Sequence, residues 1–167
     1  IVTFTLRPMR RYHVEELLEI AAALARPQAH GDLLPILVDL AAFEGGGIGA
    51  FIAQRGELLP VDELALARSW LTSRLAMWEI VDSDPGRTVT MRDTRTGDQV
   101  VVTERTASQT LRQGQYLLAR VVAAGSQNQI IGLPLNVELR HRGSLMALLD
   151  SEPGAAALAS WIGAAFA

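Results

Sequence analysis

Cysteine and lysine are both absent from the 167 residues of this sequence. Without cysteine it has no disulfide, no thiolate nucleophile and no Cys-based zinc or iron–sulfur site, and we expect a reducing, cytoplasmic setting. All fifteen basic residues are arginine, a bias typical of GC-rich coding sequences. The 18 acidic residues outnumber them, and the net charge of −3 argues against a generally cationic nucleic-acid-binding body.

Long apolar runs are absent as well. A membrane-spanning helix needs about 18–20 consecutive apolar residues, and the closest candidate, residues 154–167, is only about three to four helical turns long. We expect this segment to be a buried or docking helix, and we expect no membrane partner. The sequence begins at Ile1 without the layout of a signal peptide, which predicts a fragment or a processed chain.

Helical periodicity marks the first part of the chain. Apolar spacing of three and four residues predicts helices at 12–25, 33–41, 51–56 and 61–73, after a short strand at 1–6. The segment from Glu44 to Ala50, EGGGIGA, is as rich in glycine as phosphate-binding loops are. It lacks both the lysine of a Walker loop and the dinucleotide-binding spacing, so we predict a helix end followed by a loop.

After residue 74 the pattern changes to short strands separated by turn residues. Five strands are expected at 77–81, 88–92, 100–103, 116–122 and 129–133, followed by helices at 139–149 and 155–166. Closure into a small SH3-like or OB-like barrel would remove the exposed edges of such short strands. The predicted fold class is α+β, with an N-terminal helical layer, a small antiparallel five-stranded barrel and two C-terminal helices.

Three parts follow from this pattern. We expect a helical part at residues 1–74, the barrel at 75–134, and C-terminal helices at 135–167 that pack on the rest to form one compact unit.

Residues suited to catalysis or metal binding are scattered. The three histidines, His13, His30 and His141, lack metal-ligand spacing, and no serine lies in a nucleophile motif. We therefore predict no catalytic, cofactor-binding or metal site, and a protein that is not an enzyme. An enzyme would need a cleft holding a carboxylate with a displaced pKa, for which Glu79, Glu104 and Asp39 are the candidates.

The arginines of the predicted barrel are the candidate nucleic-acid contacts. Residues 81–142 carry eight arginines and six acidic residues, whereas the rest of the chain is net acidic. Arginine clusters bind phosphates, and aromatic side chains in small barrels stack on bases. The candidates are Arg87, Arg92, Arg95, Arg105, Arg112, Tyr116 and Arg120. The alternative is a solvated surface on which these arginines and the nearby acids neutralise one another.

A resemblance to one bacterial protein group rests on four runs. They are FIAQRGELLPVDE from Phe51, Trp70-Leu71, DPGRTVTMRDTRTG from Asp84 and ERTASQTLRQG from Glu104. Residues 33–149 are similar to proteins of high-GC bacteria in which such a region often follows a Cys-rich zinc motif of the kind found at the C-terminus of the translocase ATPase SecA. That motif is missing here, because the sequence has no cysteine. The resemblance implies a bacterial, cytoplasmic accessory protein with a helix-plus-barrel body, and it assigns no functional residue.

These observations lead to two expectations about function. The first is a non-catalytic interaction module, without a cofactor, that binds a protein partner or a second copy of itself through surfaces such as residues 154–167. The alternative is a nucleic-acid-binding protein that uses the arginine-bearing face of the barrel.

Overall fold

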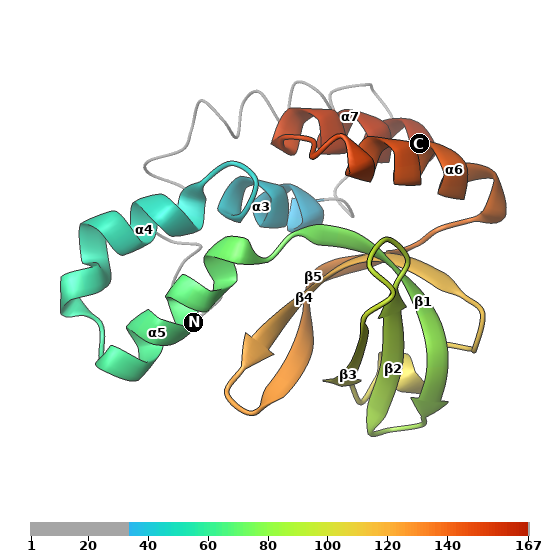
Figure 1. Cartoon of the computed structure of the whole chain (residues 1–167), viewed down its shortest axis with the longest axis horizontal. Coiled ribbons are helices and arrows are strands. Elements are labelled where there is room, and N and C mark those ends of the chain that lie inside the picture. The colour runs from blue at the N-terminus through green and yellow to red at the C-terminus, as the bar shows by residue number, and fades with distance from the viewer. Residues whose placement is uncertain (1–33, 167) are drawn as a thin grey trace. The chain divides into compact units, whose positions relative to one another are not determined.

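A computed structural model describes residues 34–166 of the chain (Figure 1). The strand expected at 1–6 and the helix expected at 12–25 lie outside the described residues. The chain divides into two compact units, a helical unit that ends at Thr72 and resumes at Asp150, and a barrel unit from Ser73 to Leu149.

The described part of the helical unit consists of short helices. They are α3 (Leu34–Ala42), α4 (Gly47–Arg55), η2 (Gly56–Leu58), α5 (Val61–Ser69), η3 (Trp70–Thr72) and α7 (Ala155–Ala165). Helix α3 contacts both α4 and α7, and the buried side chains include Ile36 and Leu40 of α3 and Leu158 and Ile162 of α7. Because α7 buries its apolar side in this way, mainly small residues of the expected docking helix remain exposed.

No single helix among residues 34–166 is long and apolar enough to cross a membrane. One bent pair, residues 35–42 with 47–58 at an angle of 59°, passes the same test by length and composition.

The glycine-rich segment ends α3, as predicted, but its second half is not a loop because α4 already begins at Gly47. The amide of Gly45 donates to the Leu40 carbonyl at 2.8 Å, and that of Gly46 donates to the Phe43 carbonyl at 3.0 Å. Gly46 adopts a φ of 77°, the left-handed conformation that glycine adopts without steric cost. The first half of the segment therefore ends one helix, and the second half begins the next.

Gly45→Ala is expected to lower the free energy of unfolding by about 1–3 kcal/mol, as overpacking does. A Cβ at this position would lie 2.8 Å from the Ala41 carbonyl oxygen, a backbone atom that cannot rotate away. Gly49→Ala, inside α4, is the matched control. Its Cβ would meet only Leu71 Cδ2 at 3.9 Å, so it should stabilise the protein by about 0.5–1 kcal/mol. Denaturant titration followed by circular dichroism measures both, and equal effects would contradict the prediction.

The barrel unit contains the five expected strands. They are β1 (Leu75–Asp84), β2 (Thr88–Asp93), β3 (Gln99–Thr103), β4 (Tyr116–Ala124) and β5 (Gln127–Asn136), with η4 (Ala107–Gln109) before β4 and α6 (Leu139–Asp150) after β5. They close in the order β1-β2-β3-β5-β4, so the predicted α+β fold with a small barrel is confirmed. This order is that of an OB-like rather than an SH3-like barrel.

One detail of the predicted barrel is wrong, because its strands are not antiparallel throughout. Strands β3 and β5 pair in parallel, with Val102 opposite Asn128. A closed ring with an odd number of strands cannot alternate direction at every step, so at least one neighbouring pair has to be parallel. Here β3–β5 is that pair, and the other four pairs are antiparallel.

Alternating side chains fill the inside of the barrel. The core cluster consists of Trp78, Ile80, Val89, Met91, Val102, Leu117 and Ala119. A register shift between Ile80 and Asp82 marks a bulge in β1, which bends the strand and lets it pair with β4 at one end and β2 at the other.

The two C-terminal helices belong to different units, whereas the sequence suggested that they form one part. Helix α6 belongs to the barrel unit because it contacts the turn between β2 and β3. Thr94 Oγ1 lies 2.9 Å from the Met77 carbonyl oxygen and 3.2 Å from Met146 Sδ of α6, and Arg95 donates to the Leu149 carbonyl at 3.0 Å. Helix α7 instead contacts α3 in the helical unit.

Candidate binding face on the barrel

The outward side chains of β1, β2 and β3 form one continuous surface. Cross-strand register places Glu79, Arg92 and Gln99 in one row, then Asp82, Thr90 and Val101, then Asp84, Thr88 and Thr103. We call these nine residues the outer face. Its three rows carry acidic residues on β1, threonines and an arginine on β2, and amide, aliphatic and hydroxyl groups on β3.

Strand β4 differs because both of its sides are buried. Leu117 and Ala119 belong to the core cluster, while Leu118, Arg120 and Val122 on the opposite side are 0 %, 0 % and 4 % exposed. By contrast, the side chain of Val101 on β3 is 54 % exposed. Within residues 34–166, all three strands of the outer face therefore carry exposed side chains: Asp82 and Asp84 on β1, Arg92 on β2, and Gln99 and Val101 on β3.

The turns that flank this face are short. In OB folds the β1–β2 and β4–β5 loops contribute to binding, but here three residues (85–87) and two residues (125–126) join the strands. Gly86 and Gly125 adopt φ values of 80° and 67° that suit such tight turns. Turns of this length cannot wrap around a ligand, so they lie at the edges of the outer face and do not enclose it.

Buried Ser108 of η4 fixes the β1–β2 turn. Its hydroxyl accepts a hydrogen bond from the Gly86 amide at 2.9 Å and donates to the Arg105 carbonyl at 3.2 Å, and its own carbonyl accepts from Ser83 Oγ at 2.7 Å. These contacts hold the edge of the outer face in one conformation.

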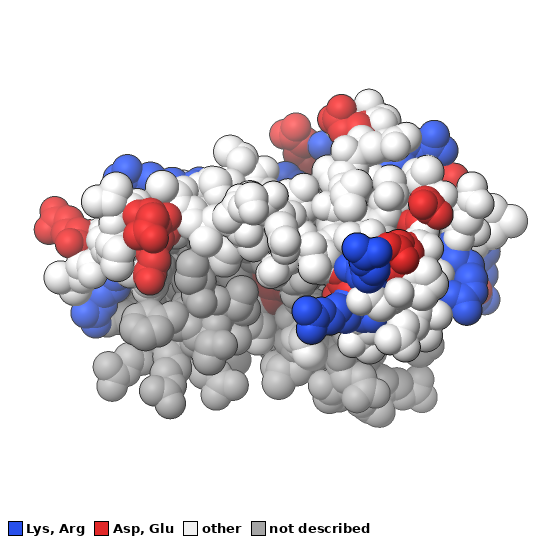
Figure 2. Space-filling model, turned by 90° about the horizontal axis from the view of Figure 1, so that it is seen from below, with Lys and Arg blue, Asp and Glu red and all other residues white. Residues whose placement is uncertain are grey.

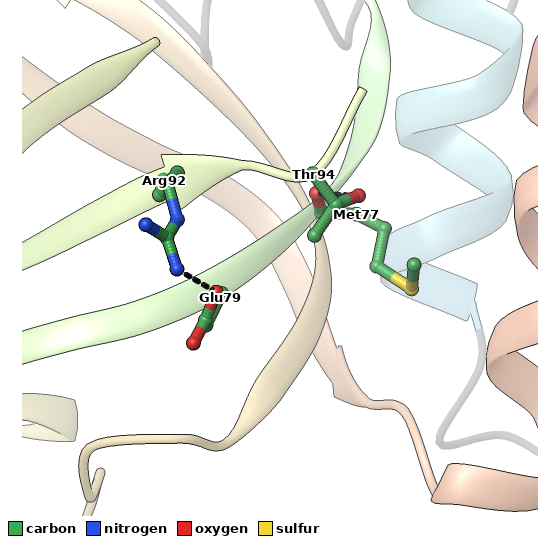
Figure 3. Close-up of polar contacts among 4 residues, drawn as sticks. All are labelled: Met77, Glu79, Arg92 and Thr94. Carbon is green, nitrogen blue, oxygen red and sulfur yellow. Dashed lines mark hydrogen bonds and ion pairs between the residues drawn. The ribbon is translucent and has the colours of Figure 1, made fainter. Parts of the chain in front are cut away.

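Arg92 and Glu79 form an ion pair across β1 and β2. Arg92 Nη2 lies 2.6 Å from Glu79 Oε2 (Figure 3). The Glu79 carboxylate raises the pKa of Arg92 above its ordinary value, first through this hydrogen bond and then through its charge. At the other end of the face, Arg87 Nη1 lies 3.5 Å from Asp84 Oδ2. Arg92 of the outer face and Arg87 of the adjoining turn are thus both paired with acids of β1.

Tyr116 continues the row of Glu79 and Arg92 onto β4. It is the register partner of Glu79, and the guanidinium carbon of Arg142 from α6 lies 3.6 Å from the centre of its ring. Arg142 therefore covers one face of the only aromatic ring among the candidates. Sequence reasoning missed Arg142, and the only signal was the run Arg140-His141-Arg142.

The predicted nucleic-acid contacts do not form a single cluster. Arg92 and Tyr116 come together through Glu79, and Arg87 lies on the β1–β2 turn. Arg105 is exposed before η4, Arg95 bonds to α6, and Arg112 donates to the carbonyls of Gln109 and Leu111 at 2.9 and 3.0 Å. In the surface view, blue and red side chains are interspersed among white ones (Figure 2).

Arg120 is a correction to the predicted set. It is fully buried, and its Nη1 donates to the Ser73 carbonyl at 3.1 Å. The residue lies on β4, whose apolar character predicted a central strand, and a side chain in that position has no access to a ligand on the surface.

The carboxylates considered for catalysis have structural contacts or lie buried. Glu79 pairs with Arg92, and Glu104 Oε1 accepts hydrogen bonds from the amides of Thr106 and Ala107 at 2.9 and 3.2 Å. Asp39 is buried in α3, 7 % exposed. Within residues 34–166, no group of three or more His, Asp or Glu side chains is placed to hold a metal ion.

Comparison of this chain with protein-family models, with curated proteins and with solved structures gives no match. The resemblance to high-GC bacterial proteins therefore stays a prediction.

Proposed function

We propose that this protein is a non-catalytic accessory module that binds a protein partner through the outer face of its barrel. The observation that carries the proposal is a three-strand surface that combines paired charges with an exposed aliphatic side chain, Val101, on β3. Protein interfaces combine apolar contact with complementary charge in this way. The short flanking turns also suit a partner that brings its own large surface, rather than a small ligand that must be enclosed.

Nucleic-acid binding is the alternative function. Arg92 and Tyr116 lie in one row with Glu79, and Arg142 of α6 stacks on Tyr116, which favours it. Against it, a single-stranded nucleic acid needs a cationic groove and free aromatic faces, whereas three acids and one arginine lie on the outer face itself. The ring of Tyr116 also has one face covered by Arg142.

We place this module in the bacterial cytoplasm. The cysteine-free sequence and the resemblance to proteins of high-GC bacteria support this assignment, and self-association is one form the partner contact can take.

Val101→Arg tests the proposed function, with Gln54→Arg, at an exposed position of α4 in the helical unit, as a matched control. We expect affinity capture from a high-GC bacterial lysate, read by mass spectrometry, to recover proteins with the wild type and the control that are lost with Val101→Arg. Light scattering over a concentration series tests whether the partner is a second copy of the chain. Identical recovery and identical association by all three proteins would contradict the proposal.

A second arm tests the alternative. Fluorescence anisotropy with labelled single- and double-stranded oligonucleotides at low salt is expected to show no binding by the wild type. Binding that weakens steeply with salt and is reduced by Arg92→Gln would favour the nucleic-acid function instead.

A further inference from the structure

The middle row of the outer face differs from the rows on either side of it. Asp82, Thr90 and Val101 are cross-strand neighbours, and both end residues, Asp82 and Val101, are exposed. Since adjacent strands lie about 4.8 Å apart, the row spans about 10 Å from β1 to β3. It therefore offers a carboxylate, a hydroxyl and an aliphatic side chain in a line.

The charge of Asp82 is uncompensated, unlike that of its neighbours. In the row above, Glu79 is held by Arg92, and in the row below, Asp84 lies near Arg87. The Asp82 carboxylate has neither an ion pair nor a side-chain hydrogen bond within the part of the chain that the structure describes. The free charge of the outer face is thus one negative charge in its central row.

We propose that the outer face recognises a protein segment that carries a lysine or arginine about 10 Å from an aliphatic side chain. The cation binds Asp82, and the aliphatic group packs on Val101. This inference rests on the proposed function and names the chemistry of the partner. Opposite charges meet at Asp82, and burial of Val101 adds apolar contact. The carboxylates of the flanking rows are already paired with Arg92 and Arg87, so a cation gains most in the central row, which fixes the position of the segment.

Selection of a random-peptide phage library on immobilised protein tests this inference. The baits are the wild type, Asp82→Asn, Val101→Thr and a control, Asp98→Asn, which removes the same charge from an exposed position in the β2–β3 turn. All of these side chains point to solvent, and circular dichroism verifies that the variants are folded. We expect the wild type and Asp98→Asn to select peptides in which a cationic residue and an aliphatic residue recur at a constant spacing. Asp82→Asn should lose the preference for the cation, and Val101→Thr the preference for the aliphatic residue.

Binding constants make the comparison quantitative. A selected peptide, fluorescently labelled, should bind Asp82→Asn about tenfold more weakly than the wild type, because a hydrogen-bonded charge pair is lost, and should bind Asp98→Asn unchanged. Peptides with a different consensus, or with equal affinity for Asp82→Asn, would overturn the partner chemistry while leaving the proposed function in place. A library that yields no binding peptide on any bait, together with unchanged lysate capture by Val101→Arg, would overturn both.

Discussion

Arg120→Ala is expected to lower the free energy of unfolding by about 3–5 kcal/mol. Truncation of a large buried side chain leaves a cavity, which costs about 2–5 kcal/mol for residues of similar length. Loss of the guanidinium also removes one of two donors to the Ser73 carbonyl, the other being Arg74 Nη1, and a hydrogen bond to a charged group contributes about 1.5–3 kcal/mol. Denaturant titration followed by circular dichroism measures the effect.

A neighbouring arginine provides the control for this prediction. Arg74 Nη1 donates to the same Ser73 carbonyl at 3.1 Å but belongs to an exposed residue, so Arg74→Ala should cost less than about 1 kcal/mol. Arg120→Met keeps most of the buried volume and should fall between the two, at about 1–3 kcal/mol. Equal losses for Arg74→Ala and Arg120→Ala would show that burial of Arg120 is not what makes it important.

Trp78→Ala should destabilise the barrel by about 3–5 kcal/mol, the range for large aromatic residues truncated in a core. Trp78 is 8 % exposed and belongs to the core cluster. Its indole Nε1 also donates to the Ala119 carbonyl at 3.0 Å, linking β1 to β4 from inside the barrel. Thermal unfolding followed by circular dichroism at a β-sheet wavelength reports the loss.

Trp78→Phe separates the two contributions of this residue. Phenylalanine retains part of the apolar volume and lacks the donor, so we expect a loss of about 1–3 kcal/mol for the unsatisfied acceptor and the reduced packing. Val101→Thr, an outward substitution on β3, should change stability by less than about 1 kcal/mol. If Trp78→Phe is as stable as the wild type, the indole hydrogen bond contributes nothing measurable.

The strands could be predicted from the sequence, but their ends could not. Alternation identified β1 only at residues 77–81, because the bulge between Ile80 and Asp82 shifts the register and the ladder continues over polar residues to Asp84. Strand β5 was expected to end at Leu133, yet it continues to Asn136. Gly132 has a φ of 71° there, and Pro134 follows it. Glycine and proline usually weaken or end a strand, and only the pairing with β4 shows that β5 continues past both residues.

The candidate site was only partly predictable for a related reason. The sequence identified Arg87 and Arg92 as arginines of the barrel, but not that acids on β1 hold both of them. Arg120 looked like the other arginines, although the apolar strand around it was predicted to be central. Arg120 is buried because it lies on β4, which is covered on both sides. The stacking of Arg142 on Tyr116 depends on where α6 crosses the barrel, which no local pattern specifies.

The division of the helical unit into two stretches of sequence has a consequence for folding. Helix α3 contacts α7, yet about 110 residues separate Ala42 from Ala155, and the whole barrel lies between them. Contacts so distant in sequence form slowly, and during synthesis every strand of the barrel is complete before α7 exists. The helical unit is therefore the last to be finished. A chain that stops before α7 would retain its barrel sequence but leave Ile36 and Leu40 of α3 without their partner, so early termination should produce aggregation that starts at the helices.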